Sequence, residues 1–288
     1  MSTLSNKIDF ALVISAQGAN VNGDPLNGNR PREDFEGYGE ISDVCIKRKI
    51  RNRLQDLGER IFVQSNDRSD DGCKSLRDRA ESNDEIKALS KGKGTNPEDY
   101  ARIACEQWID VRSFGQVFAF KGGEKKGDGV SVGIRGPVTV RTAKSVSPVN
   151  IVSMQITKSV NIEGEGGKSS DTMGMKHFVE FGVYVIKGSI NPQLAEKTGF
   201  SDEDAEKIKE ALKTLFENDC SAARPDGSMQ VCKLVWWNHE GKTPKYSSAR
   251  VHNSIKITPN KPSPKEYSDY TVTIEELDGL NPEVYDLV

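Results

Sequence analysis

The segment HFVEFGVYVIK, residues 177–187, is apolar on both of its alternating faces. Successive side chains of a β-strand point to opposite sides of the sheet, so neither side of this strand is suited to water. The pattern predicts an interior strand, and the rest of the chain must therefore supply strands to flank it.

Other segments have the patterns of companion strands. Residues 7–16, KIDFALVISA, predict a largely buried opening strand. From Val130 to Thr142 apolar and polar residues alternate, which predicts one strand with a core face and a basic face. Further strands are predicted at 230–237, 249–257 and 270–275.

A helix is predicted from Ser42, which can cap its N-terminus, to Leu57, with Gly58 as the stop. Its apolar residues recur at helical spacing and form one stripe. On a helical wheel, five cations flank or oppose that stripe, and we expect them to point outward. The stripe consists of Ile46, Ile50, Leu54 and Leu57, and the cations are Lys47, Arg48, Lys49, Arg51 and Arg53.

Two more amphipathic helices are predicted, one beginning near Asn96 and the other near Ser201. Pro97 suits the first helical position, and Ser201 with Asp204 resembles the start of a capping box. Residues 64–99 are polar with few apolar positions, so we interpret them as an insertion rather than as core.

Without its insertions, the order of elements is strand, helix, strand, long arm, strand, helix, strand. This is the β-α-β-β-α-β order of the α+β, ferredoxin-like fold, which RNA-recognition modules use with the sheet and its loops facing the nucleic acid. The segment that joins the strands at 130–142 and 177–187 is too long for a hairpin turn, so we interpret it as a projecting, partly β arm. Fold alone leaves the function open.

The composition excludes several classes of protein. The 288 residues carry a formal net charge of −3, and no apolar run is long enough for a membrane span or a signal peptide, so we expect a cytoplasmic protein with no membrane partner. Five widely spaced cysteines without a C-x-x-C pair argue against a disulfide framework and a structural zinc site. Three histidines on separate segments leave few places for histidine catalysis.

Charge is distributed unevenly along the chain. Residues 44–55 and 129–162 contain cations without any Asp or Glu, whereas 201–219 and 265–288 are acidic. Such a chain can offer a basic surface to phosphates while its total charge stays negative. A merely solvated basic face gives the same pattern, and composition does not separate the two.

Four motifs occur in the order found in a known family: NGDPLNGNRPR (22–32), DVRSFGQVFA (110–119), IRGPVTVR (134–141) and MGMKHFVEFGVY (173–184). Together they resemble the backbone subunit of type I CRISPR Cascade surveillance complexes, most closely the type I-C form. Each motif alone is weak, but four in register are specific. The resemblance covers most of the chain and is least constrained in the polar insertion and the acidic tail.

The resemblance implies one RNA-recognition-like palm over 1–288, with a helical fingers insertion over about 59–110 and a long β-hairpin thumb over 145–176. It implies that copies of the chain polymerise head to tail along one CRISPR guide RNA, and that the exposed guide bases pair with target DNA. Its other implied partners are the remaining Cascade subunits and a helicase-nuclease that the complex recruits. We expect no cofactor, no metal and no catalytic residue.

Residues 22–32 are the first candidate contact to the guide RNA. Asn22 and Asn29 can approach phosphates through amide and main-chain N–H groups, or they can simply satisfy an ordinary turn. Arg30 and Arg32 flank Pro31, whose stiffness suits fixed phosphate contacts, although solvated arginines would have the same pattern.

The predicted helix 42–57 and the segments after it supply further candidates. Lys47, Arg48 and Arg51 lie on one arc and are predicted to contact phosphates, whereas Lys49 can serve either RNA or a structural ion pair, as can Arg53. Two arginines are expected to share one strand face, where they would attract the sugar-phosphate chain without reading bases. They are Arg135 and Arg141, and the remaining polar candidates are Ser113 and Gln116.

In the arm, Met173 and Met175 are flexible apolar side chains suited to wedging between bases. Packing onto a neighbouring subunit is an equally good interpretation, and both also apply to Met154. Lys176 and His177 are predicted to add polar contacts to RNA.

A metal-dependent ribonuclease of the same fold, acting on single-stranded RNA, is the alternative function. Paired acids exist, such as Asp70 with Asp71, but they form no recognisable metal or acid–base arrangement. Related subunits of type III complexes cut RNA with an acid in the fingers region, and the polar insertion also carries acids, so the sequence leaves this alternative open. A purely protein–protein module is a third, weaker possibility.

Overall fold

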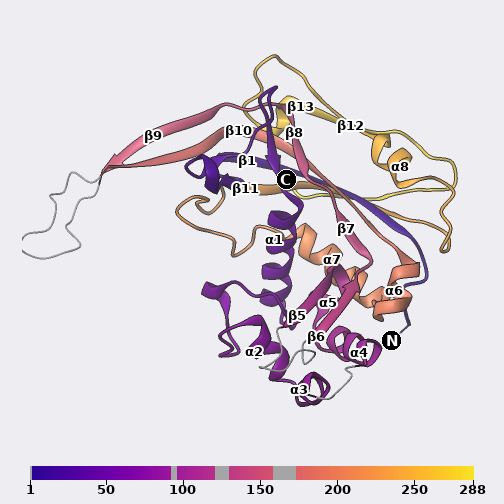
Figure 1. The fold of residues 1–288 in the computed structure, drawn as a ribbon. Helices are drawn as coiled ribbons and strands as arrows, with labels where there is room; N and C mark the ends of the chain where they lie inside the picture. The colour runs from indigo at the N-terminus through magenta and orange to yellow at the C-terminus, as the bar shows by residue number, and fades with distance from the viewer. Residues whose placement is uncertain (1, 92–95, 121–129, 158–172) are drawn as a thin grey trace, which may run out of the picture.

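The computed structural model describes residues 2–91, 96–120, 130–157 and 173–288. Its largest element is an antiparallel sheet with the strand order β14-β11-β1-β10-β8-β4, in which β7 and β9 also pair with β10 (Figure 1). The strands of this sheet are β1 (Ile8–Ala19), β4 (Tyr38–Ile41), β7 (Val138–Val140), β8 (Ala143–Pro148), β9 (Ile151–Thr157), β10 (Met173–Ile190), β11 (Met229–Asn238) and β14 (Glu283–Asp286).

The two-sided apolar pattern does mark an interior strand. It lies in β10, which pairs with β1 along one edge and with β7, β8 and β9 along the other. The opening strand is confirmed as β1, which lies between β10 and β11.

Two helices that begin where the sequence predicts lie over one face of the sheet. The Ser42 side chain accepts a hydrogen bond from the backbone N–H of Cys45 at the start of α1 (Asp43–Asp56). Ser201 and Asp204 form a capping box at the start of α7 (Asp202–Lys213). Each cap satisfies backbone donors that the first helical turn leaves free.

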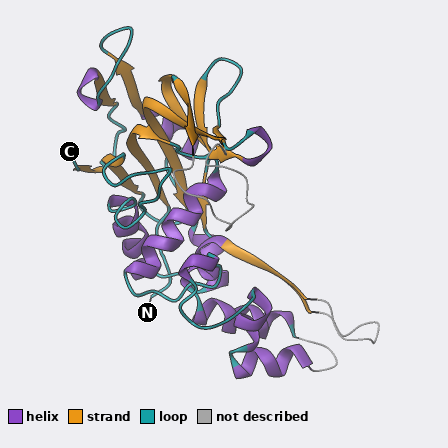
Figure 2. Ribbon diagram, turned by 90° about the vertical axis from the view of Figure 1, so that its left-hand side faces the viewer, coloured by secondary structure: helices purple, strands orange, loops and turns teal. Residues whose placement is uncertain are grey.

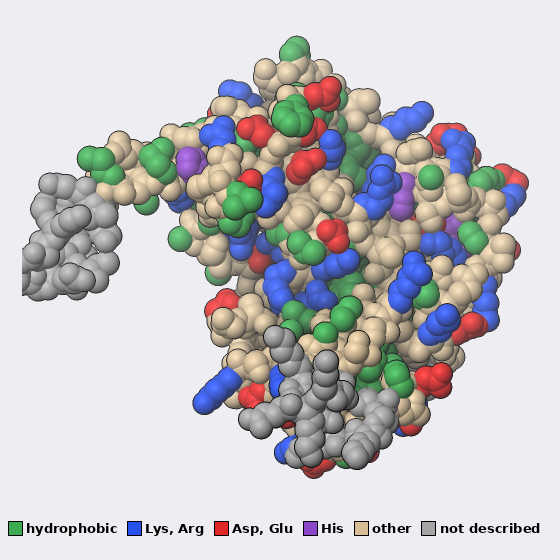
Figure 3. Space-filling model, viewed as in Figure 1, with side chains coloured by type: hydrophobic (Ala, Val, Ile, Leu, Met, Phe, Trp, Pro, Cys, Tyr) green, Lys and Arg blue, Asp and Glu red, His purple; other side chains and the backbone are tan. Residues whose placement is uncertain are grey.

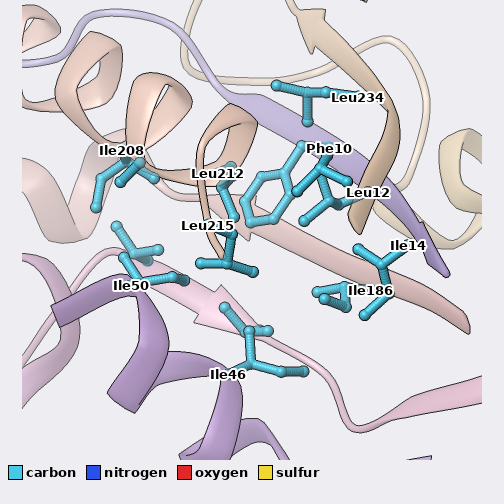
Figure 4. Packing of buried hydrophobic residues seen from close by; sticks show 14 of the residues in the cluster. Phe10, Leu12, Ile14, Ile46, Ile50, Ile186, Ile208, Leu212, Leu215 and Leu234 are labelled. Carbon is cyan, nitrogen blue, oxygen red and sulfur yellow. The ribbon is translucent and has the colours of Figure 1, made fainter. Parts of the chain in front are cut away.

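The main core lies between these helices and the sheet. Aliphatic residues of α1 and α7 surround the inner side chains of the central strands, and Figure 4 shows Ile46, Ile50, Ile208 and Leu212 facing Phe10 and Leu12. Leu57 departs from the predicted stripe, because it follows the last residue of α1 and is 41% exposed.

The C-terminal segment covers much of the opposite face of the sheet. It contains α8 (Ser248–Ser254), β12 (Ile255–Pro259) and β13 (Tyr270–Ile274), and its side chains pack on those of Ala11 and Val13. This sheet therefore lacks the open face over β1 that the analogy with RNA-recognition modules suggests. The predicted strand 249–257 is a helix as far as Ser254, because Ser247 caps α8, and becomes a strand only at β12.

Residues after α1 form a helical lobe with a core of its own (Figures 1 and 2). The ring of Phe118 lies 4.9 Å from that of Phe62 and 5.1 Å from that of Tyr100, between centroids. Ala80 and Ile86 are also buried there, so the polar insertion contributes to a core, contrary to the expectation. The lobe contains α2 (Leu76–Glu81), α3 (Asp84–Lys91), α4 (Pro97–Gln107), α5 (Ile109–Phe114), β5 (Gly115–Phe120) and β6 (Val130–Arg135).

The strand predicted over 130–142 is two strands. β6 pairs with β5 in the lobe, whereas β7 pairs with β10 in the main sheet. The break falls at Gly136–Pro137, where proline offers no N–H to a ladder and a Cβ on Gly136 would lie 2.3 Å from the carbonyl oxygen of Ser113. Arg135 and Arg141 therefore do not share one strand face.

The arm is a hairpin of β9 and the first part of β10, paired from Ile151 opposite Val179 to Thr157 opposite Met173. It projects from the body of the molecule (Figures 1 and 2). Of the predicted thumb, residues 145–148 belong to β8 in the main sheet, and residues 158–172 lie outside the described part of the chain.

The remaining elements are short. They are β2 (Gly23–Asp24), β3 (Arg30–Pro31), α6 (Pro192–Thr198) and three 3-10 turns at Pro25–Asn27, Asn66–Arg68 and Tyr267–Asp269. Within the described ranges, no helix is both long and apolar enough to cross a membrane.

Candidate nucleic-acid interface

The β2–β3 hairpin meets the root of the arm through three polar side chains. Arg30 Nη1 donates a hydrogen bond to Ser153 Oγ at 2.9 Å, and His177 Nδ1 lies 2.8 Å from the same oxygen. Strand pairing sets this arrangement, because Ser153 and His177 are direct partners across β9 and β10. A predicted cation of the first motif and a predicted polar residue of the last are thus brought together.

The exposed residues of the arm divide between its two faces. The cross-strand partners of His177, Met175 and Met173 are Ser153, Gln155 and Thr157, and side-chain alternation puts all six on one face. Met154 and Lys176 pair with each other on the opposite face. Met173, Met175 and Met154 are 65%, 56% and 49% exposed, so the three predicted wedge residues do not form a single group.

The asparagines of the first motif shape the hairpin. Asn29 has a positive φ of 60°, and its carbonyl oxygen accepts a hydrogen bond from Asn20 Nδ2 at 2.7 Å. Its side chain lies against Gly23, where a Cβ would come within 2.0 Å of Asn29 Oδ1. Asn22 Oδ1 accepts from the backbone N–H of Ser42 at 2.9 Å and ties the hairpin to α1. Both asparagines therefore have the turn-satisfying role that the sequence left open.

Arg32 of the same motif is partly neutralised. Its Nη2 lies 3.2 Å from Asp24 Oδ1, and its side chain is 40% exposed. Asp24 is thereby held in an ion pair. The nearby Asp34 is also paired, since its carboxylate accepts a hydrogen bond from Lys144 at 2.7 Å, and this bond lowers the pKa of the Asp34 carboxyl.

Two cations of α1 connect the helix to the lobe. Arg51 Nε donates to Asp110 Oδ2 at 2.9 Å, and its guanidinium lies 5.0 Å from the centre of the Phe114 ring. Asp110 is fully buried and also accepts from the backbone N–H groups of Phe62 and Val63, at 2.7 and 3.1 Å. Arg48 donates to the carbonyl oxygen of Val63 at 2.5 Å.

Two others connect α1 to the chain that follows α7. Lys49 is 4% exposed and pairs with Asp219, while Arg53 Nη2 lies 2.6 Å from Glu217. Burial lowers the pKa of the Lys49 ammonium, and Asp219 partly offsets that effect. The expectation that all five cations point outward is therefore wrong, most clearly for Lys49, because the partner acids lie beside the stripe rather than in solvent.

Positive charge still gathers over α1. Figure 3 shows Lys and Arg side chains clustered over this helix, between the sheet and the helical lobe. Burial lowers the pKa of the Arg48 guanidinium, and the neighbouring Arg51 acts in the same direction, whereas Asp110 and Asp67 oppose the shift. Lys47 is held by Asp43 at 3.1 Å but keeps 24% of its side chain exposed.

The candidates around the lobe are dispersed. Ser113 is fully buried, so the prediction that it bonds to RNA is wrong in this conformation. Gly136 packs closely against the backbone at the end of α5, where a Cβ would lie 2.3 Å from the Ser113 carbonyl oxygen. Gln116 is partly exposed on β5 and bonds to the carbonyl oxygen of Val117, and Arg135 is exposed at the end of β6.

A buried polar cluster lies where the sequence analysis named no site. Asp9 in β1 is fully buried and accepts hydrogen bonds from Ser189 Oγ at 2.6 Å and from His239 Nε2 at 2.8 Å. Burial raises the pKa of the Asp9 carboxyl, but the hydrogen bond with His239 and the charge of Lys7 together lower it by more than burial raises it. The carboxyl group therefore stays ionised. The sequence feature that could have indicated this cluster was Asp9, an acidic residue inside an otherwise apolar strand pattern. Across the described residues, no group of three or more His, Cys, Asp or Glu side chains is arranged to hold a metal ion.

Known proteins resemble this chain along most of its length. A sequence profile of the family described as CRISPR-associated protein Cas7 matches residues 6–275. The chain belongs to the Cas7 family. A curated relative in Haloferax volcanii, also described as CRISPR-associated protein Cas7, is 30% identical over 224 residues. The match covers 72% of this chain but 63% of that Cas7 protein, which is less than two-thirds of its length.

Two solved structures are also similar to this Cas7 chain. A chain of a CRISPR RNA-guided surveillance complex in a pre-nicking state is 16% identical, with a TM-score of 0.49 and coverage of 85% of this chain and 81% of that one. A chain of a second CRISPR RNA-guided surveillance complex is 15% identical, with a TM-score of 0.45 and coverage of 83% and 72%.

Proposed function

We propose that this Cas7-family chain is a guide-RNA-binding backbone subunit of a Cascade complex of type I-C. In this role it polymerises head to tail along the CRISPR guide, contacts the other Cascade subunits and presents guide bases to target DNA. The assembled complex recruits a helicase-nuclease. The subunit works in the cytoplasm as a non-catalytic scaffold.

One observation carries this proposal. A single face of the projecting arm combines two exposed methionines with His177, and the root of that face meets Arg30 of the β2–β3 hairpin. Cations next to flexible apolar side chains can hold a phosphate while separating adjacent bases, which suits a strand bound without regard to sequence. Base pairing of the guide then supplies the sequence reading.

In this role, the parts of the molecule correspond to a palm, fingers and a thumb. The strands β11, β1, β10 and β7, with α1 and α7 on one face, form an RNA-recognition-like palm of the ferredoxin-like type. The helical lobe forms the fingers, and the β9–β10 hairpin forms the thumb, which reaches a neighbouring copy.

The test is binding of a labelled single-stranded guide RNA at several salt concentrations. We expect the Arg30→Ala/His177→Ala variant to bind about tenfold more weakly, with a salt slope reduced by about 1, because one phosphate contact is lost. Arg102→Ala is the matched control, since Arg102 is an exposed lobe arginine held by Glu106 at 3.0 Å. Equal binding by the variant and the control would contradict the proposed interface.

The same preparation separates the ribonuclease alternative. We expect RNA incubated with the protein and Mg²⁺ to remain intact, whereas cleavage that disappears with EDTA would favour the metal-dependent ribonuclease.

A further inference from the structure

A cavity of about 630 Å³ opens on the side of the sheet that faces away from α1. Tyr184 and Ile186 of β10 pack toward α1, and side chains alternate along a strand, so Lys187 points to the opposite side. The polar residues that line the cavity are Glu40, Arg141, Thr142, Lys144, Lys187 and Asn253.

The charges in this cavity are not balanced. Lys144 is neutralised by Asp34 at 2.7 Å and Glu40 at 3.5 Å. Neither Arg141 nor Lys187 has a carboxylate within ion-pair distance in the part of the chain that the structure describes. Among the described residues, Glu40 is the acid in the lining, and it is already held by Lys144. Lys144, Arg141 and Lys187 against Asp34 and Glu40 therefore leave a net charge of +1, placed on the side of Arg141 and Lys187.

Lys187 is also partly removed from water. Its side chain is half-buried, and burial lowers the pKa of its ammonium, with the nearby Arg141 acting in the same direction. Two like charges in a partly desolvated cavity repel each other, and an anion bound between them would relieve that repulsion. The Thr142 hydroxyl and the Asn253 amide, in the same lining, are uncharged groups that can donate to anion oxygens.

We propose that this cavity is a phosphate site for single-stranded nucleic acid. Arg141, Thr142, Lys144 and Asn253 are exposed at its mouth, so a phosphodiester can enter while its neighbours in the strand remain outside. The volume lies within the range of roughly 300–1,000 Å³ that is typical of ligand sites. Arg141 is a guide contact in the sequence-based prediction, but here it lies in this cavity, apart from Arg30 and His177. The sheet separates the cavity from α1, so the cavity binds a different phosphate.

The experiment uses the full chain saturated with unlabelled guide RNA. A fluorescein-labelled oligothymidylate of 20 nucleotides is then titrated and followed by anisotropy. We expect Arg141→Gln/Lys187→Gln to bind it about tenfold more weakly, the loss that corresponds to about 1.4 kcal/mol, with a lower salt slope. Lys256→Gln is the matched control, because Lys256 is an exposed lysine of β12 outside this cavity and should bind as the unchanged chain does.

Two outcomes would overturn the proposal. Unchanged oligothymidylate binding by the double variant, with an unchanged melting temperature, overturns it. If inorganic phosphate at low millimolar concentration binds the guide-loaded chain in calorimetry while the oligonucleotide does not bind, the proposal is also overturned, because the cavity would then take free phosphate rather than a strand. If the double variant melts early, Lys187→Met alone gives the same test. Guide RNA binding, measured separately, should be unchanged in all these variants, so failure here is distinct from failure of the guide interface.

Discussion

The cations of α1 and those of the sheet-face cavity occupy opposite sides of the same sheet and have opposite surroundings. On α1, Lys49 and Arg51 have buried or half-buried acids as partners and join the helix to the rest of the chain. In the cavity, no carboxylate of the residues that the structure describes forms an ion pair with Arg141 or Lys187. A cluster of positive charge in a sequence can therefore be structural or available to a ligand, and the position of the acids decides which.

The largest effect is expected at Asp110. Replacement by Ala removes the acceptor of Arg51 and of two backbone N–H groups and leaves a buried cation unpaired. We expect the free energy of unfolding to fall by about 3–5 kcal/mol in thermal or urea denaturation. Glu106→Ala, which removes an exposed acid on α4, should change it by less than about 0.5 kcal/mol. Similar losses in both variants would show that the burial of an acid does not decide how much its ion pair stabilises the fold.

A smaller loss is expected for Lys49→Met. The change leaves Asp219 with Arg224 alone, at 3.3 Å, so part of the ion pair survives. We expect a loss of about 1–3 kcal/mol by urea denaturation. Lys47→Met is the comparison on the same helix, and its more exposed pair with Asp43 should contribute no more than about 1 kcal/mol. Should Lys47 prove the more important of the two, burial would not be what separates them.

The pair formed by Asp71 and Arg79 in the lobe provides a pH test. The hydrogen bond from Arg79 lowers the pKa of Asp71 from 3.8 to about 2, so the folded chain binds the proton less readily than the unfolded chain does. The stabilisation is therefore complete above about pH 4 and is lost as the pH falls toward 2. We expect the difference in melting temperature between the unchanged chain and Asp71→Asn to narrow over that window. If the difference in melting temperature stayed constant between about pH 4 and pH 2, the stabilisation would not come from the ionised Asp71 carboxylate.

The smallest effect is expected for Lys187→Met. Because burial lowers the pKa of Lys187, the folded chain disfavours its charge, and removing the ammonium should leave the stability equal or slightly higher, within about 1 kcal/mol. The unfolded chain binds more protons between the two pKa values, so the stability of the unchanged chain rises with pH and the difference should close under alkaline conditions. Strong destabilisation in calorimetry would show that Lys187 has a structural partner after all.

The local elements could largely be predicted from the sequence, because their signals are local. Ser42, Ser201 and Asn96 cap the helices they were expected to cap, and the two-sided pattern of β10 reports its interior position. The break at Gly136–Pro137 was missed, since the alternation of Val130–Thr142 continues through it while the partner strand changes.

The candidate interface was harder to predict, because side-chain partners come from distant parts of the chain. Lys49 pairs with Asp219 and Arg30 bonds to Ser153, and in both cases the partner lies more than a hundred residues away, so no local sequence pattern predicts the contact. The division of the arm residues between two faces needs the register of β9 against β10, which no single strand contains. Lys187 was overlooked because it looks like the polar end of an apolar strand.

The arm has one further consequence. The two-stranded ribbon has exposed apolar side chains on both faces, with Met173 and Met175 on one face and Met154 on the other. Such a ribbon can contact a nucleic-acid strand with one face and a protein surface with the other, through different residues. Substitutions on one side should then loosen a single attachment and leave the other in place, so the two attachments can change independently as the chain evolves.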